Sequence, residues 1–366
     1  MELILTYKKS VAQRRIFFDM YYRHVYLVQK IYMAQIIRWG ILGAGRIARK
    51  FASDLRLVED AQLTAVGART QQGADTFAAE FNIPHSHGSY QELIADTEVD
   101  IIYIATTHNF HYENTLLCLN NNKAVLCEKP FAMNAKQVKE MINLAREKKL
   151  FLMEALWTKF LPQYNKVRQM INDGMIGDIR SIRADFGFRP QEPVSPRLFD
   201  PALGGGTVLD IGIYPVFITL SLLGRPDEIE ATMSPAPTGV DLQCAMLFKY
   251  KNGALAQLFS TNDSNTATEA DISGTTGRIR MRGRFHELSA VIDYTSGERA
   301  DETEAIPFDK DAAGFGYQYQ ARHAGECLRS GLTESPVMSH QHSIDLIETL
   351  DAIRAKAGIH YPADNE

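Results

Sequence analysis

From residue 36 onward, short apolar runs alternate with amphipathic stretches. The run IIRWGIL at 36–42 precedes a glycine-rich turn, and behind that turn apolar residues recur at helical spacing: Ile47, Ala48, Phe51, Ala52 and Leu55. A spacing of three and four residues is typical of one face of an α-helix, whereas a short apolar run that ends at glycine is typical of a buried strand. The pattern predicts strand, glycine turn and helix.

The alternation then repeats along the chain. Strands are predicted at LTAVGA (63–68), DIIYIAT (100–106), KAVLCEK (123–129) and LFLMEAL (150–156), with helices over 73–81 and 91–95, after His111, and after Asn134. Asn134 is a natural N-cap, and the buried face of its helix is expected to hold Val138, Met141, Ile142 and Ala145. Such repetition predicts a doubly wound parallel sheet of the Rossmann type, with domain bounds at 34–155.

The pattern changes after residue 155, where β-type segments predominate. IRSIRADFGF (179–188), CAMLFKY (244–250), ALAQLFST (254–261) and GRIRMRGRF (277–285) look like strands, and KNGA (251–254) predicts a hairpin between the second and third. We expect residues 156–366 to form a second domain with an open sheet, making the whole chain an α/β protein. An open sheet of that size needs its free face covered, for instance by a partner subunit.

Residues 1–33 differ from the rest, being rich in aromatic and basic side chains. A continuous apolar core and a small-residue cleavage site, which a secretory signal requires, are absent from this stretch. A mitochondrial or membrane-surface helix is one interpretation. Met33 opens MAQIIRWGILGAG as a natural start, so we expect the extension to lie outside the native fold.

Composition bounds the class of protein. The 366 residues, 45% hydrophobic and 23% charged, are typical of a globular chain with two domains. A net charge of -5 gives no electrostatic reason to expect a nucleic acid or a membrane surface as partner, so a small-molecule substrate is expected. We find no run of about eighteen apolar residues and predict no transmembrane helix.

Cysteines and histidines suggest neither disulfides nor a metal. The four cysteines show no C-x-x-C pair, which fits reduced thiols and a cytoplasmic location. Two H-x-H pairs occur, His85/His87 and His340/His342, without a third ligand at a recognisable spacing. We therefore expect no bound metal.

The turn after the first strand has the chemistry of a dinucleotide site. Gly43 permits the bend, Gly45 allows the backbone to approach a pyrophosphate, and Ala48 allows close packing of helix on strand. The phosphates would bind N–H groups at the helix start, so we predict cofactor contacts from Gly43, Ala44, Gly45, Arg46 and Ile47.

The end of the second strand bears on the choice of cofactor. An NAD site usually carries an acid there for the ribose 2′-hydroxyl, and this chain has Arg69 instead. An arginine offers a planar fork to a 2′-phosphate, so NADP is favoured over NAD. A solvated Arg69 with dual cofactor use is the alternative.

Ligands of such sheets bind at the carboxyl ends of the strands. Two segments leave the sheet at that edge, ATTHNFH (105–111) and EKP (128–130). They place Thr106, His108, Glu128 and Lys129 near the cofactor, whereas His111 is expected to cap or pack its helix.

A further pair of polar side chains lies in GGGTVLDIGIYP (204–215). If a helix begins near Thr207, Asp210 and Tyr214 lie on one face, because residues four apart in a helix are neighbours. A carboxylate at the helix start and a core tyrosine would explain the pair structurally. An acid/base role is the alternative.

These motifs together resemble the Gfo/Idh/MocA oxidoreductase family. The resemblance rests on GILGAGRIA (40–48), VLCEKPFAMN (125–134), EALWTKFLP (154–162), GGGTVLDIGIYP and ESPVMSHQHSIDLIETLDAIR (334–354), and is greatest to the branch of the family that contains dihydrodiol and D-xylose dehydrogenases. It implies a Rossmann domain, a second domain on an open, mainly antiparallel sheet, and a homodimer formed through that sheet.

The resemblance also implies roles for particular residues. It assigns catalysis to Lys129, Asp210 and Tyr214, with Tyr214 as the acid/base that moves the hydroxyl proton and Lys129 as the cation that helps the phenol ionise. Asp210 would orient the lysine or bind a substrate hydroxyl.

Three more residues are substrate candidates. Trp157 would be an apolar wall for the substrate or else a core residue, and Arg197 and Phe199 would line the pocket or else belong to a surface loop. The expected activity is NADP-dependent hydride transfer to or from a sugar, vicinal diol or related hydroxy-carbonyl compound. An NAD-linked inositol-type or anhydrofructose-type enzyme and a non-catalytic NADP-binding regulator are the alternatives.

Overall fold

The N-terminal sheet has six strands. The computed structural model describes residues 35–191, 194–297, 303–306 and 313–365, so the predicted extension over 1–33 lies outside the described residues. The strands are β1 (Ile37–Leu42), β2 (Ala61–Gly67), β3 (His85–His87), β4 (Ile101–Ile104), β5 (Ala124–Glu128) and β6 (Leu152–Ala155). They lie in the order β3-β2-β1-β4-β5-β6, and the pairs β2–β3, β1–β4, β4–β5 and β5–β6 are parallel. This is the doubly wound sheet that the alternation predicted.

Helices connect the strands as the apolar spacing indicated. They are α2 (Arg46–Leu55), α3 (Gln71–Phe81), α4 (Tyr90–Ala95), α5 (His111–Asn120) and α6 (Ala135–Lys148). The Asn134 side chain caps α6 by accepting from the Gln137 N–H at 3.0 Å, and the four apolar residues predicted for its inner face are buried. Strand β3 was not predicted, because three residues are too few to show a period of two.

The second sheet has eight strands and is mainly antiparallel. Its strands are β7 (Ile179–Gly187), β8 (Glu228–Pro235), β9 (Asp241–Lys249), β10 (Leu255–Thr261), β11 (Ala270–Gly274), β12 (Gly277–Arg282), β13 (Val291–Ser296) and β14 (Thr303–Ile306). They lie in the order β14-β13-β12-β11-β7-β10-β9-β8, and among the described pairs only β7–β10 is parallel. The predicted hairpin is the β9–β10 turn, where Gly253 has φ +84°. Four of these strands, β8, β11, β13 and β14, were not predicted from sequence.

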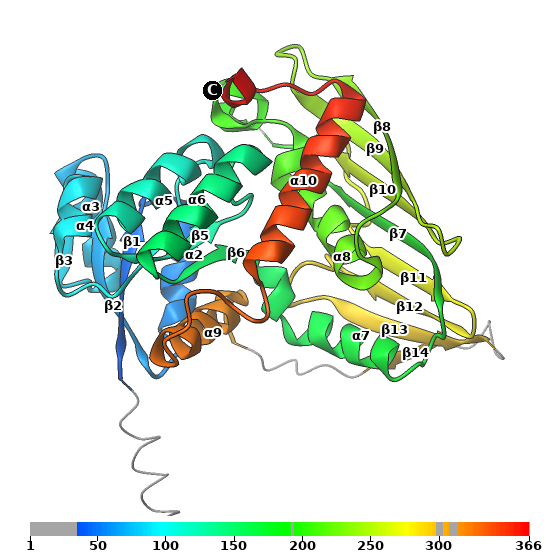
Figure 1. Ribbon diagram of the computed structural model, residues 1–366, viewed down its shortest axis with the longest axis horizontal. Helices are drawn as coiled ribbons and strands as arrows, with labels where there is room; N and C mark the ends of the chain where they lie inside the picture. Colours follow the sequence, from blue (N-terminus) through cyan, green and yellow to red (C-terminus); the bar gives the residue numbers. More distant parts are fainter. Residues whose placement is uncertain (1–34, 192–193, 298–302, 307–312, 366) are drawn as a thin grey trace, which may run out of the picture. The chain divides into compact units, whose positions relative to one another are not determined.

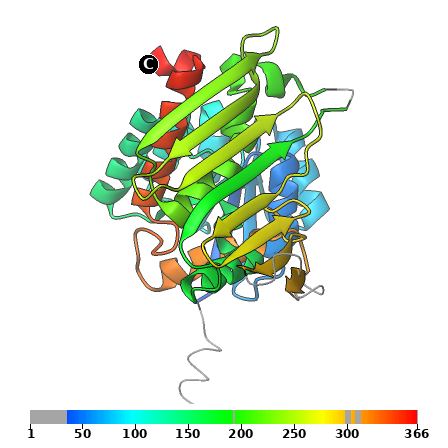
Figure 2. The same cartoon turned by 90° about the vertical axis from the view of Figure 1, so that its right-hand side faces the viewer.

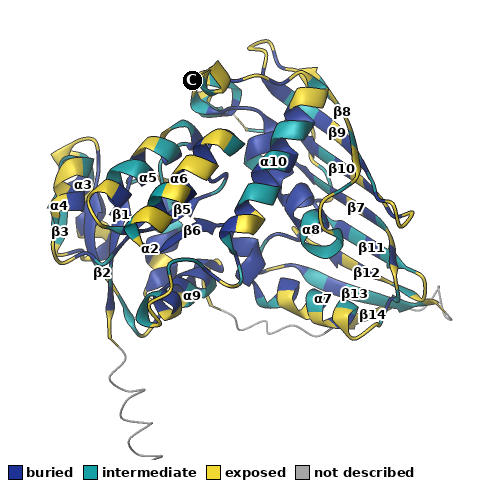
Figure 3. Cartoon of the chain, viewed as in Figure 1, coloured by how far each residue is buried: buried dark blue, intermediate teal, exposed yellow. Residues whose placement is uncertain are grey.

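Helices cover one face of this sheet. They are α7 (Pro162–Asn172), α8 (Ile213–Leu223) and α10 (His340–Ala357), while α9 (Tyr317–Arg329) packs on α2 of the first sheet (Figure 1). Among the described residues, no α-helix covers the opposite face of the eight strands (Figure 2). Both sheets belong to one compact unit, Arg38–Glu366. Exposed residues gather on the outer surfaces of α3, α4 and α6 (Figure 3).

One segment departs from the expectation that no apolar stretch could span a membrane. Among the described residues, Pro201–Leu223 is long and apolar enough by length and composition alone. Its most apolar window is 72% buried inside the protein, which is typical of a core helix. Glycines, Thr207, Asp210 and Pro215 interrupt this stretch, so counting consecutive apolar residues did not reveal it.

Candidate active site

The glycine turn lies between β1 and α2. Gly43 has φ +100°, a conformation that side chains disfavour, and its N–H donates to the Gly67 carbonyl at 2.9 Å. A Cβ at Gly43 would lie 3.2 Å from the carbonyl oxygen of Ala105. Gly45 is the exposed N-cap of α2 and offers no capping side chain, which leaves the amides at the helix start available to an anion.

The residues around the turn have the predicted placement. Ala48 is fully buried, as close contact of helix and sheet requires, whereas Arg46 is exposed and Ile47 is half-buried. Arg69 is exposed at the end of β2, directly before Thr70, which caps α3. Whether these groups bind a cofactor stays a prediction.

Glu128 ends β5 as a buried carboxyl group. It accepts a hydrogen bond from the hydroxyl of Tyr103, whose ring stacks on Phe51 at a centroid distance of 3.7 Å. Burial raises the pKa of Glu128 to about 7. The stacked Tyr103 therefore holds the Glu128 carboxyl group, which titrates near neutrality, directly beside Lys129.

Lys129 follows Glu128, and its ammonium group contacts Asp210 twice. Nζ donates to the Asp210 backbone oxygen at 2.6 Å and to Oδ1 at 3.1 Å. The peptide bond to Pro130 is cis. Burial opposes the lysine charge, but Tyr214, Asp210 and Glu128 outweigh it and raise the Lys129 pKa. Burial likewise opposes the Asp210 charge, and Lys129 and Arg197 outweigh it, so the Asp210 pKa is well below its usual range.

Two further residues, one cationic and one neutral, lie at the Asp210 carboxylate. Arg197 Nη2 donates to Asp210 Oδ2 at 3.1 Å, and His108 Nε2 lies 3.6 Å from Oδ1. His108 Nδ1 lies 3.3 Å from the Gly204 carbonyl oxygen, to which it donates, and burial lowers the His108 pKa well below its usual value. His108 is therefore neutral, and Lys129 and Arg197 hold the Asp210 carboxylate between them.

The segment that carries Asp210 is not the regular α-helix that the four-residue spacing suggested. Val208–Gly212 is a π-helical turn, and α8 begins at Ile213. In a π-helix the N–H of residue i+5 donates to the carbonyl of residue i, so residue 215 would donate to the Asp210 carbonyl. Pro215 has no N–H and cannot make this hydrogen bond. Lys129 donates to that carbonyl instead. Proline thus directs a backbone acceptor toward the lysine.

A buried aspartate, Asp241, fixes the start of this turn. Its Oδ2 accepts from the N–H groups of Thr207 and Val208, both at 2.7 Å, and from Thr207 Oγ1 at 2.8 Å. Gly206 is required opposite it, because a Cβ there would lie 2.1 Å from Asp241 Oδ1. Nothing in the local pattern around Asp241 signalled this role, since its partners are more than thirty residues away.

Tyr214 lies at the start of α8, and its hydroxyl accepts from Trp157 Nε1 at 3.0 Å. Trp157 stacks on Tyr317 at 4.6 Å, and Lys129 Nζ lies over the Tyr214 ring at 5.2 Å from its centroid. Burial raises the Tyr214 pKa, although Lys129 and the Trp157 hydrogen bond lower it. The expected influence of Lys129 is present, but burial outweighs it and the phenol is protonated at neutral pH.

Sequence reasoning missed His286. Its buried ring lies 4.6 Å from the Tyr214 ring and 4.3 Å from Phe186, and its Nδ1 has no hydrogen-bond partner within the described chain. Burial lowers the His286 pKa, so the ring is neutral. His286 directly follows the predicted strand 277–285, and nothing in the local pattern signals such a placement.

Three more residues that the sequence singled out are Thr106, His111 and Phe199. Thr106 is half-buried, with its carbonyl 3.2 Å from His111, and the His111 ring donates to the Pro130 carbonyl at 2.7 Å, which fits its predicted packing role. Phe199 is half-exposed on the 3-10 turn Pro196–Phe199, and its contact with substrate stays a prediction. Lys159, two residues after Trp157, is buried, with its Nζ 5.7 Å from the ring centroids of both Tyr164 and Phe217.

The arrangement suits proton transfer beside a bound nucleotide. A protonated phenol, a lysine ammonium and a paired carboxylate meet within one cluster, and the segment 105–111 joins this cluster to the glycine turn. Ala105 faces Gly43, and His108 contacts Asp210. Carbonyl reduction requires a proton donor and also hydrogen-bond donors that stabilise the developing oxyanion.

Comparison with known proteins agrees with this geometry. Residues 37–156 match the family model described as an oxidoreductase family with an NAD-binding Rossmann fold, and residues 164–280 match the GFO/IDH/MocA C-terminal domain. Two similar curated proteins are the trans-1,2-dihydrobenzene-1,2-diol dehydrogenases of Mus musculus (39% identical over 335 residues) and Homo sapiens (37% over 338 residues). Each match covers 90% of this chain and 99% of the relative.

A solved structure has the same architecture. The 3-ketoreductase of Actinomadura kijaniata, in complex with NADP and TDP-benzene, is 27% identical with a TM-score of 0.77, over 88% of this chain and 98% of the other. The two family models together span most of the chain, and the curated relatives are more than one-third identical to it. These matches decide the family. The chain belongs to the Gfo/Idh/MocA family of oxidoreductases, as a nicotinamide-dependent dehydrogenase or reductase.

Proposed function

We propose that this oxidoreductase is NADP-dependent and acts on a vicinal diol, a sugar or a related hydroxy-carbonyl compound, with Tyr214 as its acid/base. The observation that carries the proposal is the convergence of Lys129, Asp210 and Tyr214 at the end of β5. Asp210 and Tyr214 lie 81 and 85 positions after Lys129 in the chain, so it is the fold that brings the three side chains together.

The cofactor would bind at the glycine turn and along the segment that follows β4. Gly43 and Gly45 would receive the pyrophosphate, with Ala44 and the amides of Arg46 and Ile47 at the helix start. Thr106, His108 and Glu128 would flank the nicotinamide end. Bound there, nicotinamide supplies the hydride in reduction and accepts it in oxidation.

Arg69 supports NADP over NAD. Its exposed guanidinium follows β2, where an NAD site usually presents an acid. A guanidinium pairs with a phosphate through two parallel hydrogen bonds and a full charge. The related 3-ketoreductase was solved with NADP, which agrees with this assignment.

Tyr214 would move the proton. Because burial keeps its phenol protonated, it donates that proton to a substrate carbonyl oxygen in reduction. In oxidation the phenolate must form first, and the Trp157 N–H and the Lys129 charge stabilise it. Asp210 holds Lys129 in position and keeps it charged, so that the ammonium can bind a substrate or ribose oxygen.

The substrate class follows from the relatives and from the side chains near Tyr214. The similar curated proteins are named dehydrogenases of trans-1,2-dihydrobenzene-1,2-diol, and the solved relative is named a 3-ketoreductase. Trp157 and His286 surround Tyr214 with aromatic rings, while Arg197 and Asp210 offer polar partners for hydroxyl groups. This combination favours a polyhydroxylated ring.

The proposal is tested by nicotinamide absorbance with NADP or NAD and a panel of pentoses, hexoses and trans-dihydrodiols. We expect NADP-linked turnover, and a loss of at least about a hundredfold in Tyr214→Phe, since removal of an acid/base costs about 10²–10⁴ in rate. Tyr250→Phe, which removes a hydroxyl bonded to Gly224 outside the cluster, is the matched control. Arg69→Glu should raise the KM for NADP selectively.

Other outcomes would identify the alternatives. Preference for NAD with inositol-type substrates would contradict the cofactor assignment. Tight NADP binding without turnover of any panel member, combined with no change on Tyr214→Phe in any assay, would identify a regulatory protein. Turnover that survives Tyr214→Phe would refute the proposed acid/base.

We also propose a homodimer through the open face of the eight-stranded sheet. Along β12 the buried Ile279 and Met281 alternate with Arg278, Arg280 and Arg282, which pair with acidic side chains of neighbouring strands. This charge-patterned surface suits a second copy of itself. Sedimentation equilibrium should give twice the monomer mass, and Arg280→Glu should weaken the association.

A further inference from the structure

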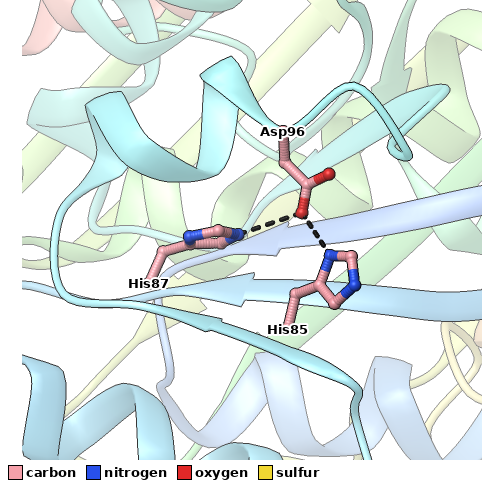
Figure 4. A group of neighbouring side chains, drawn as sticks. All are labelled: His85, His87 and Asp96. Carbon is pink, nitrogen blue, oxygen red and sulfur yellow. Dashed lines mark hydrogen bonds and ion pairs between the residues drawn. The ribbon is translucent and has the colours of Figure 1, made fainter.

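A cluster of two histidines and one aspartate lies at the edge of the first sheet, away from Tyr214. His85 and His87 are two residues apart on β3, so both side chains point to the same face of the strand (Figure 4). Asp96 follows α4 and turns its Oδ2 toward both rings, 2.6 Å from His85 Nδ1 and 3.0 Å from His87 Nε2. The three ligand-type atoms lie within 4.8 Å of one another.

The carboxylate is held in this orientation by the backbone. Asp96 Oδ1 accepts from the Glu98 N–H at 2.9 Å, which leaves Oδ2 for the two rings. Lys123 Nζ donates to the carbonyl oxygens of Asp96 and Val99 at 2.6 and 2.8 Å, so the lysine fixes the turn through its backbone. The Asp96 side chain is 7% exposed, against 34% and 22% for His85 and His87. The aspartate is thus rigid, and the rings leave access for a solute.

An outer carboxylate faces the far side of one ring. Glu98 Oε2 lies 3.8 Å from His85 Nε2, the ring nitrogen that points away from Asp96. Histidines that bind a metal almost always donate their second N–H to a carboxylate, carbonyl or water, which fixes the tautomer and increases ligand basicity. The cluster therefore has an inner set of three donor atoms, and an acidic group lies 3.8 Å beyond one of its rings, outside hydrogen-bond distance.

We propose that His85, His87 and Asp96 form a binding site for a divalent transition-metal ion of the zinc type, with water as the fourth ligand. Two imidazole nitrogens and one carboxylate oxygen form the donor set of three-ligand zinc sites. Calcium and magnesium prefer sites made of oxygen atoms, so this set selects against them. The sequence lacked a third ligand at a recognisable spacing, and the fold supplies it from the end of α4.

The site would join the edge strand to the turn that precedes β4. Strand β3 has three residues and pairs only with β2 in the described sheet, so it has few contacts of its own. The carbonyl of His87 accepts from the Ala68 N–H at 3.1 Å, directly before Arg69. A metal ion here would stabilise the edge of the sheet beside the proposed 2′-phosphate contact.

The experiment is a titration of the tag-free, chelator-treated full chain with ZnCl2 by calorimetry, and with CoCl2 by visible absorption. We expect one ion per chain and the d–d bands of a tetrahedral cobalt site. His87→Ala and Asp96→Asn should each weaken Zn²⁺ binding at least tenfold. His342→Ala removes an exposed histidine of the other H-x-H pair and should leave the affinity unchanged.

Three outcomes would overturn the proposal. The first is that neither ion binds saturably below millimolar concentration. The second is that His87→Ala and Asp96→Asn keep wild-type affinity for Zn²⁺, and the third is that His342→Ala loses as much Zn²⁺ affinity as they do. Circular dichroism identifies a variant that fails to fold, and an anomalous-scattering map of a Zn²⁺-soaked wild-type crystal then decides the matter without variants. Density for zinc between the three side chains would support the site, and density elsewhere alone would refute it.

Discussion

Substituting Asp210 by asparagine tests whether the charge cluster is organised around this carboxylate. The change removes one negative charge and keeps the size of the side chain. In the native cluster the carboxylate lies 3.1 Å from Lys129 Nζ and 3.1 Å from Arg197 Nη2. The exposed fractions of these side chains are 14% for Asp210, 12% for Lys129 and 26% for Arg197, so water screens the cluster only partly.

The magnitude follows from this burial. Removing one partner of a buried ion pair costs about 3–5 kcal/mol, because the remaining charge is left without compensation. Arg197 is a quarter exposed, and Lys129 keeps its hydrogen bond to the backbone carbonyl, so we expect the lower end of the range. Asp210→Asn should therefore lower the free energy of unfolding by about 3 kcal/mol. The Lys129 pKa should also fall, since Asp210 helps to raise it.

Urea unfolding, followed by circular dichroism at pH 7, measures the effect. The matched control is Glu228→Gln, whose carboxylate pairs with Lys249 at 2.9 Å on the surface and should contribute less than about 1 kcal/mol. High salt should reduce the small effect of Glu228→Gln more than the loss in Asp210→Asn. An Asp210→Asn protein within about 0.5 kcal/mol of wild type would show that the carboxylate does not compensate the two cations, and would refute this reasoning.

Three further predictions follow from single contacts. Trp157→Phe removes the donor to the Tyr214 hydroxyl, so the tyrosine pKa should rise. The increase of the alcohol-oxidation rate with pH, which follows ionisation of the phenol, should then move to higher pH, as initial rates between pH 6 and 10 will show. Gly206→Ala places a Cβ 2.1 Å from Asp241 Oδ1 at φ +103°, and should lower the melting temperature by several degrees and reduce turnover, whereas unchanged melting would contradict the tight fit. Burial raises the Glu154 pKa to about 7 from 4.5, so the folded state binds the proton more tightly than the unfolded chain. The free energy of unfolding should therefore fall as pH rises from about 4.5 to 7, and Glu154→Gln should reduce the difference between urea titrations at pH 5 and pH 8.

Much of the first domain could be predicted from sequence because its signals are local. Gly43 marks a turn that side chains disfavour, and Asn134 caps the helix that begins one residue later. Apolar runs of four to seven residues mark buried parallel strands, whose neighbours along the chain are helices. Strand β3 escaped prediction because its three residues are half-buried and polar.

The second domain was harder to predict for a physical reason. Its strands are exposed on one face, so their apolar residues alternate with charged ones and resemble surface segments. Along β8 no residue is fully buried, and β14 has four residues. Their strand character comes from the neighbours that they pair with, which lie elsewhere in the chain.

The candidate site shows the same division. The sequence by itself identified Lys129 at a strand end and the Asp210–Tyr214 pair behind three glycines, because strand ends and motif spacing are local properties. Only the tertiary structure brought Arg197 and His108 to the same carboxylate, gave Tyr214 a donor from Trp157, and turned Asp96 toward two histidines. These contacts join residues 9 to 102 positions apart, and no local pattern encodes them, because each depends on how sheets and helices pack.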